Sequence, residues 1–528
     1  MSATEQWVAD PTSTGSDHYI REIMRAAETG SSAVTMLNRR SFLKLAGFAG
    51  GGLVLAFHLG DPVFGDDVPK GFMPNAFLRI APDGTIVIYS KGPEIGQGIK
   101  TAFPMIVAEE LDADWSRVKV EQAAINPTVF GRQSAGGSRS IPTAWDQLRR
   151  AGATGRAMLV AAAAQTWNVP ESELSTADSV VTHAPSGRTL TYGELAGRAA
   201  ELPVPDEKSL KLKDRKDFRL LGKRIGGVDN LQVVTGQPLF GIDQVVPNML
   251  YAVFEKCPAV GGKVRTANLD DIRKLPGVRR TFIVEGTGKP TEVMPGVAIL
   301  ADSTWAAINA RRSLKVEWDE SAASQNSWSQ AVAEAKKLSA ASGAESLRNT
   351  GDFDGAMTDA RSIEAFYTYP FLSHAPLEPQ NCTAWYHDGA VEIWAPTQTP
   401  DGALKLVAGV LGIAPEKVTI HQTRVGGGFG RRLLNDYMCE AAQISKQAGV
   451  PVKLQWTRED DMQHDFYRVG GFHSFMGGVD KSGRLVAWQN HFITFSADGQ
   501  KPVSGGEMNA EEFPALLVPN VRMTQTKL

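Results

Sequence analysis

The chain has 528 residues, of which 42% are hydrophobic and 21% are charged, and its formal net charge is −3. This length allows two to four domains with substantial cores. The negative charge balance and the lack of a basic cluster argue against a nucleic-acid-binding surface. The three cysteines form no Cys-x-x-Cys pair, which excludes an iron–sulfur cluster with local ligand spacing and disfavours a zinc site. Any redox chemistry therefore requires a bound cofactor and an external electron acceptor.

Residues 1–60 are predicted to be a disordered N-terminus followed by an export signal. Arg39 and Arg40 precede Ser-Phe-Leu-Lys and a glycine-rich apolar run from Leu45 to Leu59. This pattern resembles a bacterial twin-arginine signal and predicts export to the periplasm, with the leader either cleaved or kept as an anchor. The alternative, a buried core helix, is disfavoured because four of these fifteen residues are glycine.

Residues 65–200 are predicted to alternate strands with helices that begin at glycine-rich loops. A hairpin is expected over residues 77–89, with its turn at Pro-Asp-Gly. The sequence Glu-Ile-Gly-Gln-Gly at 94–98 then leads into an amphipathic helix. A second glycine-rich loop at 134–138 precedes a long alanine-rich helix that runs to about Trp167, with Ser140 as its expected N-cap.

The middle of the chain is predicted to hold one compact α+β unit between two linkers. Residues 201–225 are rich in Lys, Asp, Pro and Arg and form the first linker. Residues 226–320 alternate short strands and helices, and residues 321–350 form the second linker, with some helical character. Residues 351–528 then make a further, strand-rich region.

Two polar positions stand out at the start of that region. His374 and Glu378 are four residues apart, but Pro376 and Pro379 forbid the helix on which they would form a metal site. Gln398 follows a predicted strand, where it is either a solvent-facing residue or an amide that donates to a bound group without adding charge.

The most informative stretch is Arg-Val-Gly-Gly-Gly-Phe-Gly-Arg-Arg at residues 424–432, which joins a predicted strand to a predicted helix. Backbone N–H groups in such a loop can approach an anion closely, and Arg431 and Arg432 favour a negative ligand at this helix end. The alternative is a tight turn with solvated arginines. The loop fits neither the dinucleotide fingerprint nor the Gly-Lys-Ser/Thr phosphate loop.

These stretches resemble the molybdenum hydroxylases of the xanthine dehydrogenase and aldehyde oxidase family. Residues 426–432 resemble the family's pterin-cradling loop, and residues 94–98 resemble its glutamine-containing pterin loop. The order of the two loops and the stretch 456–468 resemble the isoquinoline 1-oxidoreductase and bacterial membrane aldehyde dehydrogenase branch. The resemblance covers residues 38–528 and implies a multi-domain α+β molybdopterin-binding subunit, in which residues 226–320 are an α/β hammerhead domain.

The resemblance also implies which residues hold the cofactor, molybdopterin with molybdenum in its cytosine dinucleotide form. Gln97 is expected on the pterin side and Gln398 near the metal oxygens, with no side chain as a metal ligand. The full set of implied contacts is Gly96, Gln97, Gly98, Gln398, Gly426, Gly427, Gly428, Phe429, Gly430 and Arg431. Implied partners are a small subunit with two [2Fe–2S] clusters and a cytochrome c, with membrane association through a partner or an uncleaved leader.

The implied reaction is hydroxylation with water as the oxygen source, with two electrons leaving through the pterin. Family members continue past the position of Leu528, so the general-base glutamate is expected there, and no catalytic residue is assigned. Residues 521–525 are expected to be a strand with an unpaired edge. Leu433 favours aldehydes or N-heteroaromatic substrates over purines. A truncated, exported protein that binds the cofactor or a partner without turnover is the alternative function.

Overall fold

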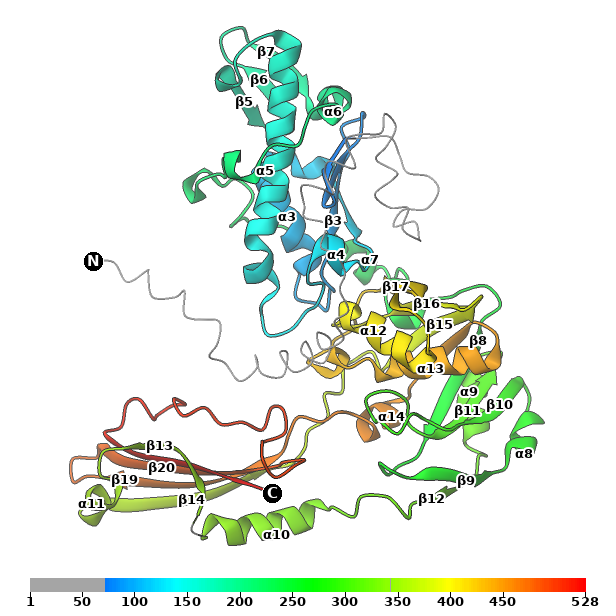
Figure 1. The fold of residues 1–528 in the computed structure, drawn as a ribbon, viewed down its shortest axis with the longest axis vertical. Coiled ribbons are helices and arrows are strands. Elements are labelled where there is room, and N and C mark those ends of the chain that lie inside the picture. The colour runs from blue at the N-terminus through cyan, green and yellow to red at the C-terminus, as the bar shows by residue number, and fades with distance from the viewer. Residues whose placement is uncertain (1–71, 342) are drawn as a thin grey trace.

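The computed structural model describes residues 72–341 and 343–528, which form an N-terminal lobe, a central sheet and a C-terminal sheet (Figure 1). The predicted multi-domain α+β class is confirmed. The predicted twin-arginine signal lies outside the described residues and stays a prediction. Within the described ranges, no helix is both long enough and apolar enough to cross a bilayer.

The N-terminal lobe consists of two small sheets and the helices that pack on them. Its strands are β1 (Phe72–Asn75), β2 (Leu78–Ile80), β3 (Ile86–Ser90), β4 (Val118–Gln122), β5 (Leu174–Ala177), β6 (Val180–His183) and β7 (Arg188–Thr191). Its helices are α3 (Ile99–Leu111), α4 (Pro127–Phe130), α5 (Ser140–Trp167) and α6 (Tyr192–Ala200). The sheets have the orders β1-β2-β3-β4 and β5-β6-β7.

The hairpin and the two helices predicted for this lobe are confirmed, because β2 pairs antiparallel with β3, α3 begins directly after Gly98 and α5 ends at Trp167. Ser140 is the first helical residue rather than the N-cap, since Arg139 occupies that position. Helices α3 and α5 pack closely at Gly152, where an added Cβ would lie 2.2 Å from the carbonyl oxygen of Val107. This contact holds the two glycine-rich loops that precede the helices in fixed relation.

The predicted linker at 201–225 has no long helix or strand, but it is anchored to the lobe. The buried carboxylate of Glu109 on α3 accepts hydrogen bonds from the backbone N–H groups of Arg219, Leu220 and Leu221, and it pairs with Lys213. The neighbouring Glu110 pairs with Arg149 on α5 at 2.6 Å. Both carboxylates therefore tie this segment and the two helices together.

The central sheet contains seven strands in the order β10-β11-β8-β18-β15-β16-β17. These are β8 (Leu250–Lys256), β10 (Val278–Val284), β11 (Gly296–Ala301), β15 (Asn381–His387), β16 (Ala390–Ala395), β17 (Val418–Gln422) and β18 (Val452–Gln455). The associated helices are α7 (Asn230–Val234), α8 (Leu269–Arg273), α9 (Thr304–Arg311), α12 (Pro400–Leu411), α13 (Asp436–Ala448) and α14 (Arg458–Gln463). The small ladder β9 (Lys263–Ala267) with β12 (Val316–Asp319) lies beside them.

Strands of the predicted hammerhead unit at 226–320 take part in this sheet. Strand β8 of that unit pairs in parallel with β18, so three strands of the predicted unit continue the sheet formed by residues 381–455. On β8, Val253 belongs to the core beneath α9, whereas Ala252 and Phe254 belong to the core under α12 and α13. Because successive side chains point to opposite faces of a strand, the sheet is covered by a hydrophobic core on both faces here. A pairing between strands some 200 positions apart leaves no local signal in the sequence.

The C-terminal sheet has the order β13-β21-β20-β19-β14. Its elements are α10 (Trp328–Ser339), β13 (Glu345–Thr350), α11 (Phe353–Thr358), β14 (Arg361–Tyr369), β19 (Gly471–Val479), β20 (Leu485–Thr494) and β21 (Asn520–Lys527). The expectation of an unpaired strand at 521–525 is wrong, because β21 pairs with β13 on one side and with β20 on the other. Strand β13 lies in the predicted second linker, so that segment is part of the sheet.

Candidate functional site

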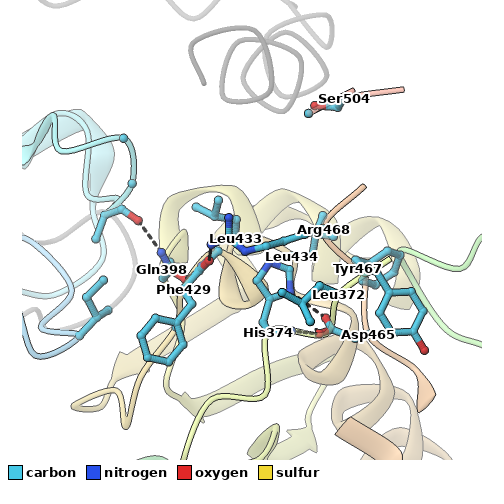
Figure 2. A pocket seen from close by; sticks show the side chains of 18 of the residues that line it. Leu372, His374, Gln398, Phe429, Leu433, Leu434, Asp465, Tyr467, Arg468 and Ser504 are labelled. Atoms are coloured by element: carbon cyan, nitrogen blue, oxygen red, sulfur yellow. Dashed lines mark hydrogen bonds and ion pairs between the residues drawn. The ribbon is translucent and has the colours of Figure 1, made fainter. Parts of the chain in front are cut away.

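The candidate site is a cavity of about 1600 Å³ at the junction of the three regions. Its walls come from six stretches of the chain, residues 95–102, 135–141, 369–374, 428–434, 465–469 and 504–507, with Gln398 beside them. Figure 2 shows the part near Gln398, Phe429 and His374. Gln97, Gln398 and Phe429, which are far apart in the sequence, all line this one cavity. The sequence-predicted loops therefore do meet.

The loop at 94–98 is held by the buried side chain of Glu94. Its Oε1 accepts hydrogen bonds from the N–H groups of Gly96 and Gly98 at 2.8 and 3.1 Å, and its Oε2 accepts from Lys100 N at 2.9 Å. Gly96 and Gly98 have φ values of 100° and 81°, which non-glycine residues rarely adopt. The glycines thus let the chain turn around one carboxylate and leave Gln97 exposed at the cavity.

Three hydrogen bonds, two of them between backbone groups, join this N-terminal wall to the C-terminal wall. Ala135 N donates to Gln398 O at 2.8 Å, and Gln398 Nε2 donates to Ala135 O at 2.9 Å. Val425 N donates to Glu94 O at 2.9 Å, directly before the glycine loop. The two halves of the cavity are therefore fixed to each other by hydrogen bonds across about 260 to 330 sequence positions.

The glycine loop is shaped by close contact with neighbouring side chains. An added Cβ at Gly428 would lie 2.4 Å from Gln398 Oε1, and one at Gly426 would lie 2.5 Å from Glu378 Cβ. Gly427 and Gly430 have φ values of 97° and 108°, whereas Gly428 is not among the residues with positive φ. The need for glycine at position 428 therefore comes from its approach to Gln398 rather than from its backbone angle.

Phe429 has a φ of 53°, in the left-handed region that an aromatic residue seldom adopts. Its side chain is 62% exposed and lines the cavity. The loop is therefore held in a strained conformation that presents an aromatic ring, which is a feature that clusters at binding sites.

Several backbone donors at the cavity have no acceptor within the described part of the chain. This holds for the N–H groups of Gly428 and Phe429 in one wall and of Gly136 and Gly137 in the other. The side-chain amides of Gln97 and Gln398 each donate one N–H to a backbone carbonyl and have a second N–H available to a ligand. Such a set fits an anionic, oxygen-rich group bound between the two walls.

Arg431 and Arg432 differ from both expectations, because their side chains neither line the cavity nor lie in solvent. Arg431 is fully buried and pairs with Asp436 through two contacts of 2.8 Å and with Asp465 at 3.0 Å. Arg432 is also buried and donates to the carbonyl oxygens of Glu378, Pro396 and Gly427. The assignment of Arg431 as a cofactor contact is thus wrong for its side chain, which supports the loop from below.

A second group of cavity residues was not assigned from the sequence. His374, Asp465, Arg468 and Glu507 line the cavity, and Arg468 donates to the carbonyl oxygen of Phe429 at 3.1 Å. Figure 2 shows His374 beside Asp465, with the two joined by hydrogen bonds. The sequence marked the stretch 456–468 only by resemblance, and it marked His374 only as a metal ligand that the neighbouring prolines disfavour. The sequence positions of charged loop residues do not indicate which of them line the same cavity.

The remaining wall is apolar and aromatic. It includes Tyr369, Phe371, Leu433, Phe466 and Tyr467. Burial raises the pKa of Tyr369 to about 12, so its hydroxyl stays protonated at neutral pH. The cavity can therefore enclose a planar apolar molecule beside a small set of polar groups. No cluster of His, Cys, Asp and Glu suited to a metal ion occurs among residues 72–341 and 343–528.

Comparison with known proteins agrees with this arrangement. Two molybdopterin cofactor-binding domain models match the chain, one over residues 46–223 and the other over residues 339–499. They include the loop at 94–98 and the loop at 426–430, the two that meet at the cavity. The chain belongs to the molybdopterin-binding subunits of the xanthine dehydrogenase family.

Among its relatives is the isoquinoline 1-oxidoreductase subunit beta of Brevundimonas diminuta, 33% identical over 487 residues that cover 82% of this chain and 61% of that protein. Another is the membrane-bound aldehyde dehydrogenase [pyrroloquinoline-quinone] of Gluconacetobacter polyoxogenes, 32% identical over 479 residues, or 88% of this chain and 61% of that protein. Quinoline 2-oxidoreductase from Pseudomonas putida aligns with a TM-score of 0.44 and 18% identity over 57% of this chain and 43% of its own. The chain spans about three fifths of the length of both curated relatives.

Proposed function

We propose that this chain is the cofactor-binding part of a molybdenum hydroxylase that oxidises aldehydes or N-heteroaromatic compounds, with water as the oxygen source. The observation that carries the proposal is the single cavity lined by Gln97, Gln398 and Phe429 from both halves of the chain. Bound molybdopterin would supply the two-electron redox chemistry, which no side chain can provide.

The residues of this chain would bind and orient the cofactor. The unpaired N–H groups at 136–137 and 428–429 would donate to its anionic oxygens, and the free N–H of Gln97 and of Gln398 would add one donor from each half. Glu94 and Glu378 hold the two loops in place, because each accepts hydrogen bonds from loop backbone. The protein's contribution would thus be a set of backbone and amide donors on two loops that these carboxylates hold in place.

The proposed substrate class rests on the apolar wall around Leu433. Leucine and aromatic side chains there favour a planar or hydrophobic substrate over a polar purine. The names of the two curated relatives include isoquinoline and aldehyde, which agrees with that preference.

We further propose the cytosine dinucleotide form of the cofactor and a small partner subunit with two [2Fe–2S] clusters, followed by a cytochrome c. The described cysteines support an external acceptor, because Cys257, Cys382 and Cys439 are buried and widely separated in the sequence. The net charge of −3 supports small-molecule rather than nucleic-acid partners. Membrane association would come through a partner or an uncleaved leader.

The test is to purify the chain together with its co-expressed partners and to measure molybdenum, pterin and turnover of isoquinoline and benzaldehyde. We expect about one molybdenum and one pterin per chain and oxidation of at least one substrate. Cofactor binding without turnover would favour the alternative, a binding protein. The name of one relative includes pyrroloquinoline quinone. Finding that quinone bound to the purified chain in place of molybdenum would contradict the proposal.

Export is a separate prediction that rests on Arg39 and Arg40. Replacing both with lysine keeps the charge but removes the pattern that the twin-arginine receptor reads. The variant is expected to accumulate in the cytoplasm, as measured by fractionation and immunoblotting. Wild-type levels of the lysine variant in the periplasm would contradict export by this route.

A further inference from the structure

His374 is held at the cavity wall in a single defined orientation. Its Nδ1 lies 3.1 Å from both carboxylate oxygens of Asp465, and its backbone N–H donates to Asp465 Oδ2 at 2.5 Å. Ser373 Oγ donates to the same oxygen at 2.8 Å. The side chain of His374 is only 10% exposed, so its ring cannot turn freely toward solvent.

Asp465 is in turn fixed as a carboxylate. The Nε of Arg431 lies 3.0 Å from Asp465 Oδ1. The same guanidinium also pairs with Asp436. Burial opposes the charge on Asp465, but the hydrogen bonds from His374 and Ser373 and the Arg431 guanidinium hold its pKa below the ordinary value. An ionised carboxylate can only accept, so Nδ1 of His374 carries the proton in this pair.

The other ring nitrogen, Nε2, faces away from Asp465, and in the neutral tautomer with the proton on Nδ1 it is a hydrogen-bond acceptor. It lies at the glycine loop, since an added Cβ at Gly430 would be 3.3 Å from it. His374 and Gly430 both line the cavity, beside the ring of Phe429. Within the described residues, no protein group donates a hydrogen bond to this nitrogen.

We infer that His374 is a positioning residue whose Nε2 accepts a hydrogen bond from the N–H or O–H group of the hydroxylated aromatic product, held against Phe429. This inference rests on the proposed function, because it takes the cavity as the substrate site. The ligand class is a planar heteroaromatic ring that carries a donor, such as a lactam or a hydroxylated ring. Asp465 acts through His374, and Arg431 and Asp436 act through Asp465.

Two substitutions separate this role from a purely structural one. His374→Asn keeps a donor near the Nδ1 position for Asp465 and removes the Nε2 position. His374→Gln places its amide near the Nε2 position and weakens the contact with Asp465. A matched control is His421→Asn, since His421 also pairs with a carboxylate, Glu392, at 3.2 Å but does not line the cavity.

The readout is equilibrium binding to the full chain by calorimetry, with isoquinolone as the probe that has an N–H and isoquinoline as the probe without one. His374→Asn is expected to weaken isoquinolone binding about threefold to tenfold and to leave isoquinoline binding unchanged. His374→Gln should keep much of the wild-type affinity for isoquinolone, and His421→Asn should match the wild type for both probes.

The inference is overturned if His374→Asn binds isoquinolone as the wild type does, or if the wild type shows no preference for isoquinolone. Equal weakening of both probes by His374→Asn, with full loss in His374→Gln, would show a structural role and would also overturn it. Molybdenum content is measured in parallel. Absence of molybdenum from the wild type would count against the proposed function while leaving the comparison of the two probes intact.

Discussion

Replacing Gly428 with alanine is expected to remove most of the bound molybdenum and pterin while the chain stays folded. The new Cβ would lie 2.4 Å from Gln398 Oε1, so the side chain of Gln398 would have to move. That movement breaks the hydrogen bonds of Gln398 with Gly430 N and with Ala135 O, which tie the two walls together. Two lost hydrogen bonds correspond to a loss of cofactor affinity of roughly tenfold or more.

Metal analysis and pterin fluorescence of the purified variant measure this effect. The matched control is Gly409→Ala on α12, because an added Cβ there meets nothing within 4 Å. Alanine also favours a helix more than glycine does, so the control should be at least as stable as the wild type. Wild-type molybdenum content in Gly428→Ala would show that the glycine loop does not hold the cofactor.

Replacing Arg431 with methionine is expected to lower the free energy of unfolding by about 3–5 kcal/mol, because the buried carboxylates of Asp436 and Asp465 lose their shared cation. The control is Arg279→Met. Arg279 pairs with Asp302 at 2.7 Å, but the two side chains are 62% and 47% exposed. Loss of an exposed pair costs about 1 kcal/mol or less. Urea unfolding measures both values, and equal losses in the two variants would contradict the structural role of Arg431.

The destabilisation by Arg431→Met should also depend on pH in a defined direction. In the wild type the pKa of Asp465 lies below its ordinary value, so its stabilising contribution is present above about pH 4 and is lost as pH falls through the folded-state pKa. In the variant Asp465 has lost this cation, so its carboxylate becomes easier to protonate. The difference in stability between wild type and variant should therefore be largest near pH 7 and shrink below about pH 4. A difference that grows on acidification would contradict this account.

Much of the local structure follows from the sequence. The helix from Ser140 to Trp167 and the strand at Val418–Gln422 appear where apolar periodicity predicts them. The two glycine loops were also identified, and the structure brings Gln97 and Gln398 to one cavity. The helix, the strand and the glycine loops each depend on a few neighbouring residues, so a short stretch carries their signal, whereas the meeting of Gln97 and Gln398 followed only from the family resemblance.

The features that the sequence did not predict depend on distant partners. The burial of Arg431 requires Asp465, which is 34 positions away. The position of Arg431 at a helix end suggested a bound ligand as its partner instead. The pairing of β21 between β13 and β20 joins residues 345–350, 485–494 and 520–527, so the expected free edge does not exist. The link of β8 to β18 likewise merges the predicted hammerhead unit with the later sheet. Long-range pairing of this kind leaves no periodic signature.

The central claim is that both halves of the chain close on one molybdopterin. The most direct test is a crystal structure of the chain purified with its cofactor. The account predicts one pterin between the walls, with its oxygens within hydrogen-bond distance of backbone N–H groups at 136–137 and at 428–429, and with both Gln97 and Gln398 in contact. A pterin bound elsewhere, or one that contacts a single wall, would contradict it.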